Sequence, residues 1–336
     1  MRSSWRRKKD IEDKRREWFF NNGSTFLQKL IADSNGISNP IRFFSSDQIL
    51  KATESFDLKF NLSRHRLFTW YKGVIEGRPY AIKKFTESEF TKDEVREVYN
   101  DIVLSTRVSN QSSFLKLLGC SLEFPLPVIV FEFPEKGVLN ERGGFGCEDG
   151  PLLPWNVRLK IAKEVAIAVT YLHTAFSRII IHRDIKPTNV FLDKNWTAKL
   201  TDFTFSVSLP EGKSWIEDEV MGTFGYMDPV YYFTGLVTEY TDVFSFGIFM
   251  LVLLLGRPAV FAGTSGVHCN ILDYVKDMQE RGESVEFGDD LNDMRPSQMK
   301  MFLELALRCC EKRNEDRPKM ILVAKEIKLI EGLLDF

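Results

Sequence analysis

The stretch IIIHRDIKPTNVFLD, residues Ile179 to Asp193, decides the fold of this 336-residue chain. Its two ends are apolar and have the length and composition of short β-strands. Between them, Asp184, Lys186 and Asn189 stand close together in a polar segment. These residues can supply a proton acceptor, a phosphate-neutralising cation and a metal ligand at one place. The pattern therefore predicts a loop of catalytic type between two strands.

The composition is typical of an ordinary globular protein. The chain is long enough for two domains or for one large bilobal unit with a sizeable core. Hydrophobic residues make up 44% of the chain, charged residues 27% and aromatic residues 13%, as in soluble globular proteins. The formal net charge of -2 gives no reason to expect nucleic acid as a partner.

Cysteine and histidine are spaced irregularly. The cysteines are odd in number and show no C-x-x-C spacing, so we expect reduced thiols and no disulfide framework. No pair of histidines has the spacing of metal ligands, so we expect no structural zinc. The residues concerned are Cys120, Cys147, Cys269, Cys309, Cys310, His65, His173, His182 and His268.

The ends of the sequence give no sign of export or membrane insertion. The first residues are charged throughout, unlike a secretory signal, and Arg2 stands where N-myristoylation needs glycine. The most apolar run, Val243 to Gly256, is shorter than the about 20 residues that cross a bilayer. We expect a cytoplasmic protein in which this run is a helix buried on all sides.

The chain divides into three parts by character. Residues 1–42 form a charged N-terminal extension, in which a basic cluster could contact an anionic plasma membrane peripherally. Interspersed acidic residues favour a solvated helix face instead. The basic residues are Arg2, Arg6, Arg7, Lys8 and Lys9, and the acidic ones are Asp10, Glu12, Asp13 and Glu17.

Residues 43–133 predict a small sheet with one larger helix. A short helix enters this part, with Ser45 or Ser46 as its N-cap. Segments of strand length and one helix-compatible segment follow. The strands are expected at Leu67–Tyr71, Arg78–Phe85 and Val128–Phe133, and the helix near Asp93–Val108.

Residues 134–336 are mostly helical by their apolar spacing. Helical periodicity recurs in three segments, 157–172, 299–309 and 323–334. The whole is an α+β fold with a small β-rich N-terminal lobe and a larger helical C-terminal lobe. Such a bilobal arrangement places a cleft, where ligand sites are common, between the lobes.

Six motifs in one order resemble the eukaryotic protein kinases over roughly residues 45–334. The catalytic-loop motif would make Asp184 the proton acceptor, with Lys186 near the transferred phosphate and Asn189 on a metal ion. By the same resemblance Lys83 anchors ATP and Asp202 binds Mg²⁺. The motifs are YAIKKF, HRDIKPTN, TDFTF, GTFGYMDP, TDVFSFG, whose Asp242 would brace the catalytic loop, and NEDRPKM.

The finer resemblance is to plant receptor-like kinases. ILKATESF, KLLGCSLE and GTFGYMDP are close in spelling to the cytoplasmic parts of wall-associated kinases. Without a transmembrane helix, the chain is most similar to receptor-like cytoplasmic kinases, in particular the HopZ-ETI-deficient-related pseudokinases.

The glycine-rich loop of that family is absent. Its three glycine positions fall on Ser63, His65 and Phe68, and no glycine occurs in this stretch before Gly73. Side chains there prevent the close backbone approach that phosphates need. With Leu62 and the bulky Trp70, Lys83 and Asp101 would line a degenerate ATP site.

Three further positions depart from the family. Asp101 is the expected partner of Lys83 but is one methylene shorter than glutamate, so we expect a stretched ion pair unless its helix moves inward; Glu94 or Glu97 could substitute. Thr204 replaces a glycine that lets Asp202 reorient. Val230 replaces a glutamate, so Arg317 is expected to lack its buried partner unless another carboxylate serves.

The segment after Asp202 carries acidic residues where related kinases carry phosphorylatable hydroxyls. Glu217, Asp218 and Glu219 could mimic a phosphate that pairs with Arg183, or could form a solvated acidic loop. The same segment offers hydroxyls that look exposed and that an effector could acetylate: Ser206, Ser208, Ser214 and Thr223.

The resemblance implies a non-catalytic adaptor or decoy in plant innate immunity. Its partners would be an intracellular nucleotide-binding leucine-rich-repeat (NLR) receptor and a bacterial effector or effector-modified cytoplasmic kinases, and no cofactor would be required. One alternative is a weak Ser/Thr protein kinase that uses ATP and Mg²⁺ through Asp184. Another is a nucleotide-sensing module that binds ATP through Lys83 and Asp202 without turnover.

Overall fold

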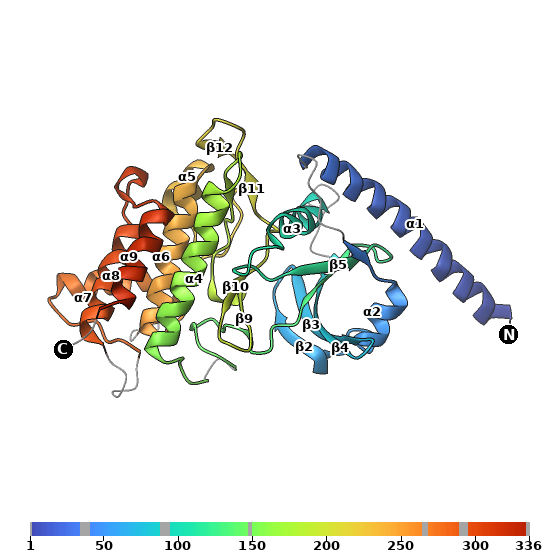
Figure 1. The fold of residues 1–336 in the computed structure, drawn as a ribbon, viewed down its shortest axis with the longest axis horizontal. Coiled ribbons are helices and arrows are strands. Elements are labelled where there is room, and N and C mark those ends of the chain that lie inside the picture. The colour runs from blue at the N-terminus through green and yellow to red at the C-terminus, as the bar shows by residue number, and fades with distance from the viewer. Residues whose placement is uncertain are drawn as a thin grey trace. The chain divides into compact units, whose positions relative to one another are not determined.

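The computed structural model describes residues 2–33, 41–87, 95–146, 150–263, 268–288 and 295–333. Two compact units divide the chain, Met1–Pro134 and Glu135–Phe336. The first is sheet-rich and the second is largely helical, as Figure 1 shows in blue-green and in green to red. This is the α+β fold that the sequence predicted.

The first unit is built on a six-stranded sheet with the order β1-β5-β6-β4-β3-β2. β1 pairs with β5 in parallel, and the other neighbours are antiparallel. The strands are β1 (Arg42–Phe43), β2 (Asn61–Arg64), β3 (Phe68–Ile75), β4 (Arg78–Phe85), β5 (Leu117–Ser121) and β6 (Val128–Glu132). The helices are α1 (Arg2–Asp33), α2 (Ser46–Ala52), the 3-10 turn η1 (Leu58–Phe60) and α3 (Val95–Val108).

The short entry helix α2 begins as the sequence predicted. Ser45 is its N-cap, and its Oγ accepts a hydrogen bond from the backbone N–H of Gln48 at 3.2 Å. The Gln48 side chain accepts in return from the Ser45 backbone N–H at 3.0 Å, which completes a capping box. The buried Ile49 then joins a core that α2 shares with the sheet.

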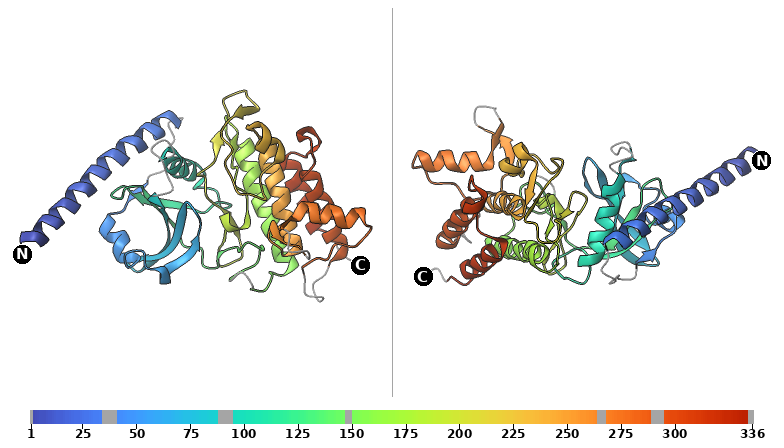
Figure 2. Two further views of the ribbon diagram at one scale, coloured as in Figure 1. Left: turned by 180° about the vertical axis from the view of Figure 1, so that it is seen from behind. Right: turned by 90° about the horizontal axis from the view of Figure 1, so that it is seen from above.

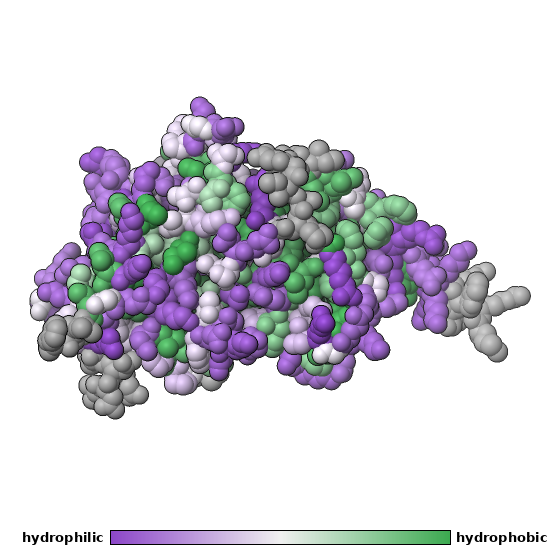
Figure 3. All heavy atoms as spheres, viewed as in Figure 1, coloured by the Kyte–Doolittle hydropathy of each residue, from purple (hydrophilic) through white to green (hydrophobic). Residues whose placement is uncertain are grey.

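In the N-terminal extension, α1 covers residues 2–33, and its two halves differ. Residues 7–14 are exposed, as expected of a solvated face. Figure 3 shows this region as largely hydrophilic. The second half packs on α3, where Asn22 and Phe26 are buried. The two further views in Figure 2 show α1 beside α3. The docking of this half was not predicted.

The second unit is organised around α6 (Glu239–Leu255), in which every side chain from Thr241 to Leu255 is buried. This confirms the helix buried on all sides, and no described helix is both long and apolar enough to span a membrane. At Gly247 an added Cβ would lie 2.5 Å from Cys310 Sγ, so only glycine allows α8 this close. The other helices are α4 (Trp155–Thr174), α5 (Pro229–Thr234), α7 (Ile271–Glu280), α8 (Pro296–Cys309) and α9 (Met320–Glu331), with 3-10 turns η3 (Pro187–Asn189) and η4 (Asn314–Asp316).

Short strand pairs complete the second unit. β8 (Ile180–Ile181) and β9 (Val190–Leu192) flank the loop of residues 182–189, as the apolar ends of the opening stretch predicted. β9 pairs with β10 and β7, and β8 pairs with β11. The remaining strands are β7 (Gly137–Val138), β10 (Ala198–Leu200), β11 (Val207–Ser208), β12 (Trp215–Glu217), β13 (Leu236–Thr238), β14 (Val260–Ala262) and β15 (His268–Asn270).

Candidate functional site

Each unit holds one set of the predicted site residues. The first unit contains Leu62, Trp70, Lys83 and Asp101, and the second contains Asp184, Lys186, Asn189 and Asp202.

Lys83 and Asp101 form a closed, fully buried ion pair. Lys83 lies on β4 and Asp101 on α3, and Nζ is 2.7 Å from Asp101 Oδ2, with both side chains 0% exposed. Ser105 Oγ donates to the other Asp101 oxygen at 3.3 Å. The ion pair is therefore not stretched, although aspartate is shorter than glutamate. Of the other carboxylates considered, Glu94 lies outside the described residues.

Aromatic rings surround the ammonium group of Lys83. Its Nζ lies 3.7 Å from the ring centroid of Phe68, 4.9 Å from that of Phe85 and 5.7 Å from that of Trp70. The β3–β4 register explains this, because Trp70 is paired with Lys83, and Phe68 with Phe85. A desolvated cation–π contact contributes about 2 kcal/mol or more. The charge of Lys83 is thus stabilised by Asp101 and by these rings.

The residues at the three former glycine positions contact one another. Ser63 Oγ lies 3.2 Å from His65 Nε2, and the ring centroids of His65 and Phe68 are 4.5 Å apart. The His65 backbone N–H also donates to the Phe68 carbonyl at 2.8 Å. This turn between β2 and β3 is held by its own side chains, in place of a glycine loop with free backbone amides.

The remaining two residues predicted for the nucleotide site differ in burial. Trp70 is 0% exposed and its ring packs on Phe131 of β6 at 5.2 Å between centroids. Leu62 is only half-buried and lies at an irregularity of β2, where the pairing register with β3 shifts between Asn61 and Ser63. Trp70 is therefore part of the core of the first unit.

In the second unit, the predicted proton acceptor Asp184 is fully engaged. Its Oδ1 accepts a hydrogen bond from Thr223 Oγ1 at 2.6 Å, and its Oδ2 accepts from Asn189 Nδ2 at 2.9 Å. Lys186 Nζ lies 2.9 Å from Asp184 Oδ2 and donates to Thr223 Oγ1 at 2.7 Å. This role of Thr223 was not predicted, although its place in the GTFGYMDP motif was an available signal.

The charge of Lys186 depends on this carboxylate. Burial on its own lowers the pKa of Lys186, but attraction to Asp184, with a further contribution from Asp202, more than offsets it. The pKa is raised above its ordinary value, so Lys186 is a cation at neutral pH. The loop thus keeps a positive group beside a carboxylate, as phosphoryl transfer requires.

Asp242 braces the loop from α6. Its carboxylate accepts the backbone N–H groups of His182 and Arg183, both at 2.8 Å, and lies 2.8 Å from His173 Nε2. Arg183 adopts a positive φ of 68°, which costs about 1–3 kcal/mol for a non-glycine residue. The brace holds that conformation whether or not the loop is used for chemistry.

Asn189 and Asp202 suit a magnesium ion. Mg²⁺ prefers oxygen ligands and is usually held by one or two protein side chains together with phosphate oxygens. Asn189 Nδ2 donates to the Asp184 carbonyl, while its buried Oδ1 has no hydrogen-bond partner among the described residues. Asp202 Oδ1 accepts from Thr204 Oγ1 at 2.6 Å. Thr204, which replaces a glycine, thus ties down the carboxylate.

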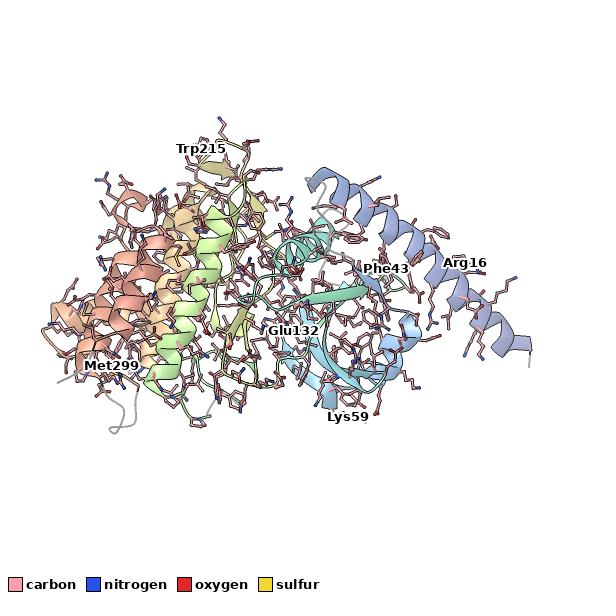
Figure 4. All side chains as sticks on the ribbon, in the orientation of Figure 1. Arg16, Phe43, Lys59, Glu132, Trp215 and Met299 are labelled. Carbon is pink, nitrogen blue, oxygen red and sulfur yellow. The ribbon has the colours of Figure 1, made fainter. Side chains whose placement is uncertain are left out.

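The acidic segment supplies one carboxylate to Arg183. Asp218 Oδ2 lies 2.9 Å from Arg183 Nη1, which also donates to the Glu219 carbonyl and contacts the Tyr231 hydroxyl. The side chains of Glu217 and Glu219 are exposed. Asp218 therefore occupies the position that the phosphate-mimic hypothesis requires, while its two neighbours fit the alternative of a solvated loop. Figure 4 labels Trp215 at the start of this segment.

The structure resolves one alternative in the second unit and contradicts one expectation there. Arg317 has a buried carboxylate partner: its Nη2 lies 2.8 Å from Asp228 Oδ1, with both side chains 1% exposed. Asp228 stands two residues before Val230 and so replaces the lost glutamate. Ser206 is also not exposed, because it is 3% accessible and its Oγ donates to the His182 carbonyl at 3.1 Å.

The other three hydroxyls proposed for modification differ in exposure and in their hydrogen-bond partners. Thr223 is half-buried and bound to Asp184 and Lys186, and Ser208 lies half-buried in β11. Ser214 is exposed. Of the hydroxyls proposed for modification, Ser214 is thus the one that an enzyme could reach without a rearrangement.

Comparison with known proteins gives a consistent result. The protein kinase domain family model matches residues 70–328. The chain is similar to the serine/threonine-protein kinase ZRK1 of Arabidopsis thaliana, with 57% identity over 96% of this chain and 95% of that protein. It is 54% identical to the non-functional pseudokinase ZRK2 of the same plant over 97% and 93%. It is 50% identical to the non-functional pseudokinase ZED1 over 95% and 98%.

Proposed function

Because the chain belongs to the protein kinase family, and within it to the HopZ-ETI-deficient group, we propose that it is a pseudokinase that acts as an adaptor or decoy. The names of its relatives divide on catalysis: ZRK2 and ZED1 are called non-functional pseudokinases, whereas ZRK1 is called a serine/threonine-protein kinase. Family membership alone is therefore compatible with an active kinase and with a pseudokinase, and our preference for the pseudokinase rests on the geometry of the site.

The enclosure of Lys83 carries the proposal. An ATP-anchoring lysine needs an ammonium group that phosphate oxygens can approach. Here Nζ is 0% exposed, bound to Asp101 and covered by the Phe68 ring at 3.7 Å. The turn that would cradle the phosphates is closed by Ser63, His65 and Phe68. Lys83 thus does not fit a nucleotide phosphate without displacement of Phe68.

The proposed partners are an intracellular NLR immune receptor and a bacterial effector or the cytoplasmic kinases that it modifies. The support for them is the resemblance of the sequence to this immune group. In that role the protein is cytoplasmic, with peripheral contact at the plasma membrane at most through the exposed basic part of α1. ATP and Mg²⁺ are not required.

A weak Ser/Thr protein kinase is the second candidate, and one specific observation favours it. Asp184, Lys186, Asn189 and Thr223 form a connected polar cluster, and the buried Asn189 Oδ1 is available to a metal ion. If Mg-ATP binds, Asp184 would accept the proton of a substrate hydroxyl and Lys186 would neutralise charge on the phosphate. Asn189 and Asp202 would hold the metal.

Phosphotransfer from labelled ATP separates these proposals. Purified protein and Asp184→Asn, both shown to be folded by circular dichroism, are incubated with Mg²⁺ or Mn²⁺ and a generic Ser/Thr substrate. The pseudokinase proposal predicts equal, background incorporation in both. Incorporation that is lost in Asp184→Asn would overturn it and make the second candidate the function. Binding of ATP without transfer would instead support a nucleotide-sensing module.

A further inference from the structure

The second half of α1 is fixed by a buried side-chain amide. Asn22 is 6% exposed, and its Nδ2 donates to the backbone carbonyls of Leu122 and Phe124, both at 2.8 Å. Its Oδ1 accepts a hydrogen bond from the Tyr99 hydroxyl at 2.7 Å. One side chain thus joins α1 to the turn after β5 and to α3. Loss of any of these buried bonds leaves a polar group unsatisfied.

The turn that receives Asn22 is itself held in place. Glu123, between the two accepting carbonyls, accepts hydrogen bonds from Ser46 N–H at 2.8 Å and Ser46 Oγ at 2.7 Å. Phe26, one helical turn after Asn22, is 4% exposed and extends the same docking face. The exposed ion pair of Arg15 with Asp47, at 2.9 Å, adds a weak contact to α2. The docking site of α1, formed by the turn at residues 122–124 and by α3, is therefore rigid and specific.

Tyr99 connects this docking site to the ion pair of Lys83. Tyr99 and Asp101 lie two residues apart on α3, so their side chains leave the helix about 200° apart. Tyr99 contacts α1 on one side, and Asp101 contacts Lys83 on the other. Burial raises the pKa of Tyr99 to about 12, so its hydroxyl keeps the proton that it donates to Asn22. α3 is thus bonded on opposite sides, to α1 through Tyr99 and to β4 through Asp101.

We propose that α1 is a latch, fastened by Asn22, that holds α3 in the position where Asp101 reaches Lys83. With α1 docked, the short aspartate side chain can close the ion pair because its helix is pressed toward the sheet. When the latch is released, α3 moves outward and Lys83 loses Asp101. A partner that pulls α1 away would thereby change the Lys83 region. This inference rests on the geometry of the first unit and does not depend on whether the protein is an adaptor or a kinase.

Chemical labelling of Lys83 in the full-length chain tests the latch. An amine-acylating reagent is applied briefly, and the modified peptide containing Lys83 is quantified by mass spectrometry, alongside hydrogen exchange of the α3 amides. In the wild type we expect Lys83 to be protected. In Asn22→Ala and in Tyr99→Phe we expect labelling of Lys83 and exchange in α3 to rise together, by about tenfold for one lost buried hydrogen bond.

A matched control separates the latch from general destabilisation. Ile75→Val removes one methyl group from the core at β3, 5% exposed, without touching α1 or α3 in the described contacts. It should lower stability without a selective rise at Lys83 and α3. If Tyr99→Phe leaves both readouts unchanged, or if Ile75→Val raises them equally, the proposal is wrong. Tyr99→Phe keeps the ring, so it carries the test even if Asn22→Ala does not fold.

Discussion

The Nζ atom of Lys83 lies 3.7 Å from the ring centroid of Phe68, a residue that occupies a glycine position of the family pattern. This one relationship links the loss of the glycine loop to the state of the lysine. A glycine has no side chain to place there, whereas phenylalanine both excludes a phosphate and stabilises the cation. The substitution therefore does more than remove a binding loop, because it gives the remaining lysine a new partner.

Phe68→Ala should destabilise the protein by about 3 kcal/mol or more, because it empties a buried aromatic site and removes the ring over the Lys83 ammonium. Urea denaturation followed by far-ultraviolet circular dichroism measures this. Phe60→Ala, a half-buried aromatic in η1, is the control and should cost less. Equal costs would mean that Phe68 has no special relationship to Lys83.

Removing one charge of the buried ion pair should lower the free energy of unfolding far more than replacing both residues with apolar ones. Asp101→Asn leaves the Lys83 charge buried without a counter-ion, and we expect a loss of about 3–5 kcal/mol. The double variant Lys83→Met with Asp101→Leu should lose much less than the sum of the two single changes. Lys84→Met, at the half-buried neighbouring position, should change stability by less than about 1 kcal/mol. Additive single and double effects would contradict a coupled pair.

Asp218 should order the segment that follows Asp202. Because its side chain is 38% exposed, the ion pair with Arg183 is expected to contribute at most about 1 kcal/mol to stability. Its effect should instead be local: Asp218→Ala should raise hydrogen exchange and proteolysis across residues 213–221. Glu217→Ala removes an exposed charge from the same segment and serves as the control. A segment that stays equally protected in Asp218→Ala would rule out the phosphate-mimic hypothesis.

Asp228, and not a carboxylate at position 230, should be the ion-pair partner that Arg317 needs for stability. Asp228→Ala removes the buried partner of Arg317 and also the N-cap of α5, so we expect a loss of about 3–5 kcal/mol. Val230→Glu restores the family residue, and it should not rescue Asp228→Ala if Asp228 has taken over the role. Thermal unfolding of the two single variants and the double variant gives the answer, and full rescue would contradict it.

Tyr99 should make stability depend on alkaline pH. Its folded-state pKa, about 12, lies above the ordinary value of 10.0 because burial disfavours the phenolate. The unfolded chain releases this proton first, so the contribution is complete below about pH 10 and is lost as pH rises toward 12. Tyr99→Phe should therefore lose stability less steeply over this window. Parallel pH profiles would show that Tyr99 does not titrate as the geometry predicts.

Much of the fold could be predicted from short motifs. The apolar ends of residues 179–193 became β8 and β9, and the run after Val243 became the buried α6, because strand and helix periodicity are local properties. The pairing of Lys83 with Asp101 was also anticipated. The sequence left open whether this pair is stretched or closed, because that depends on the position of α3, which in our proposal is set by α1, far away in sequence.

The corrections share a physical cause. Asp228 replaces a glutamate two residues later, and a sequence pattern records the missing residue but not its substitute in space. Ser206 was expected to be exposed, yet its hydroxyl is buried against the His182 carbonyl. Likewise, Phe68 was identified as a lost glycine, but its contact with Lys83 follows from the β3–β4 register. Such contacts between strands or loops require the tertiary structure.

The most direct test of the central claim is a nucleotide titration of the purified protein. Binding of ATP in the presence of Mg²⁺ is measured by calorimetry for the wild type, for Lys83→Met and for Phe68→Gly. If Phe68 and Asp101 occupy the surroundings of Lys83, the wild type and Lys83→Met should give the same heat on addition of ATP. Phe68→Gly should bind ATP better than the wild type does. Saturable binding by the wild type that disappears in Lys83→Met would show that the lysine is open to phosphate and would contradict the account.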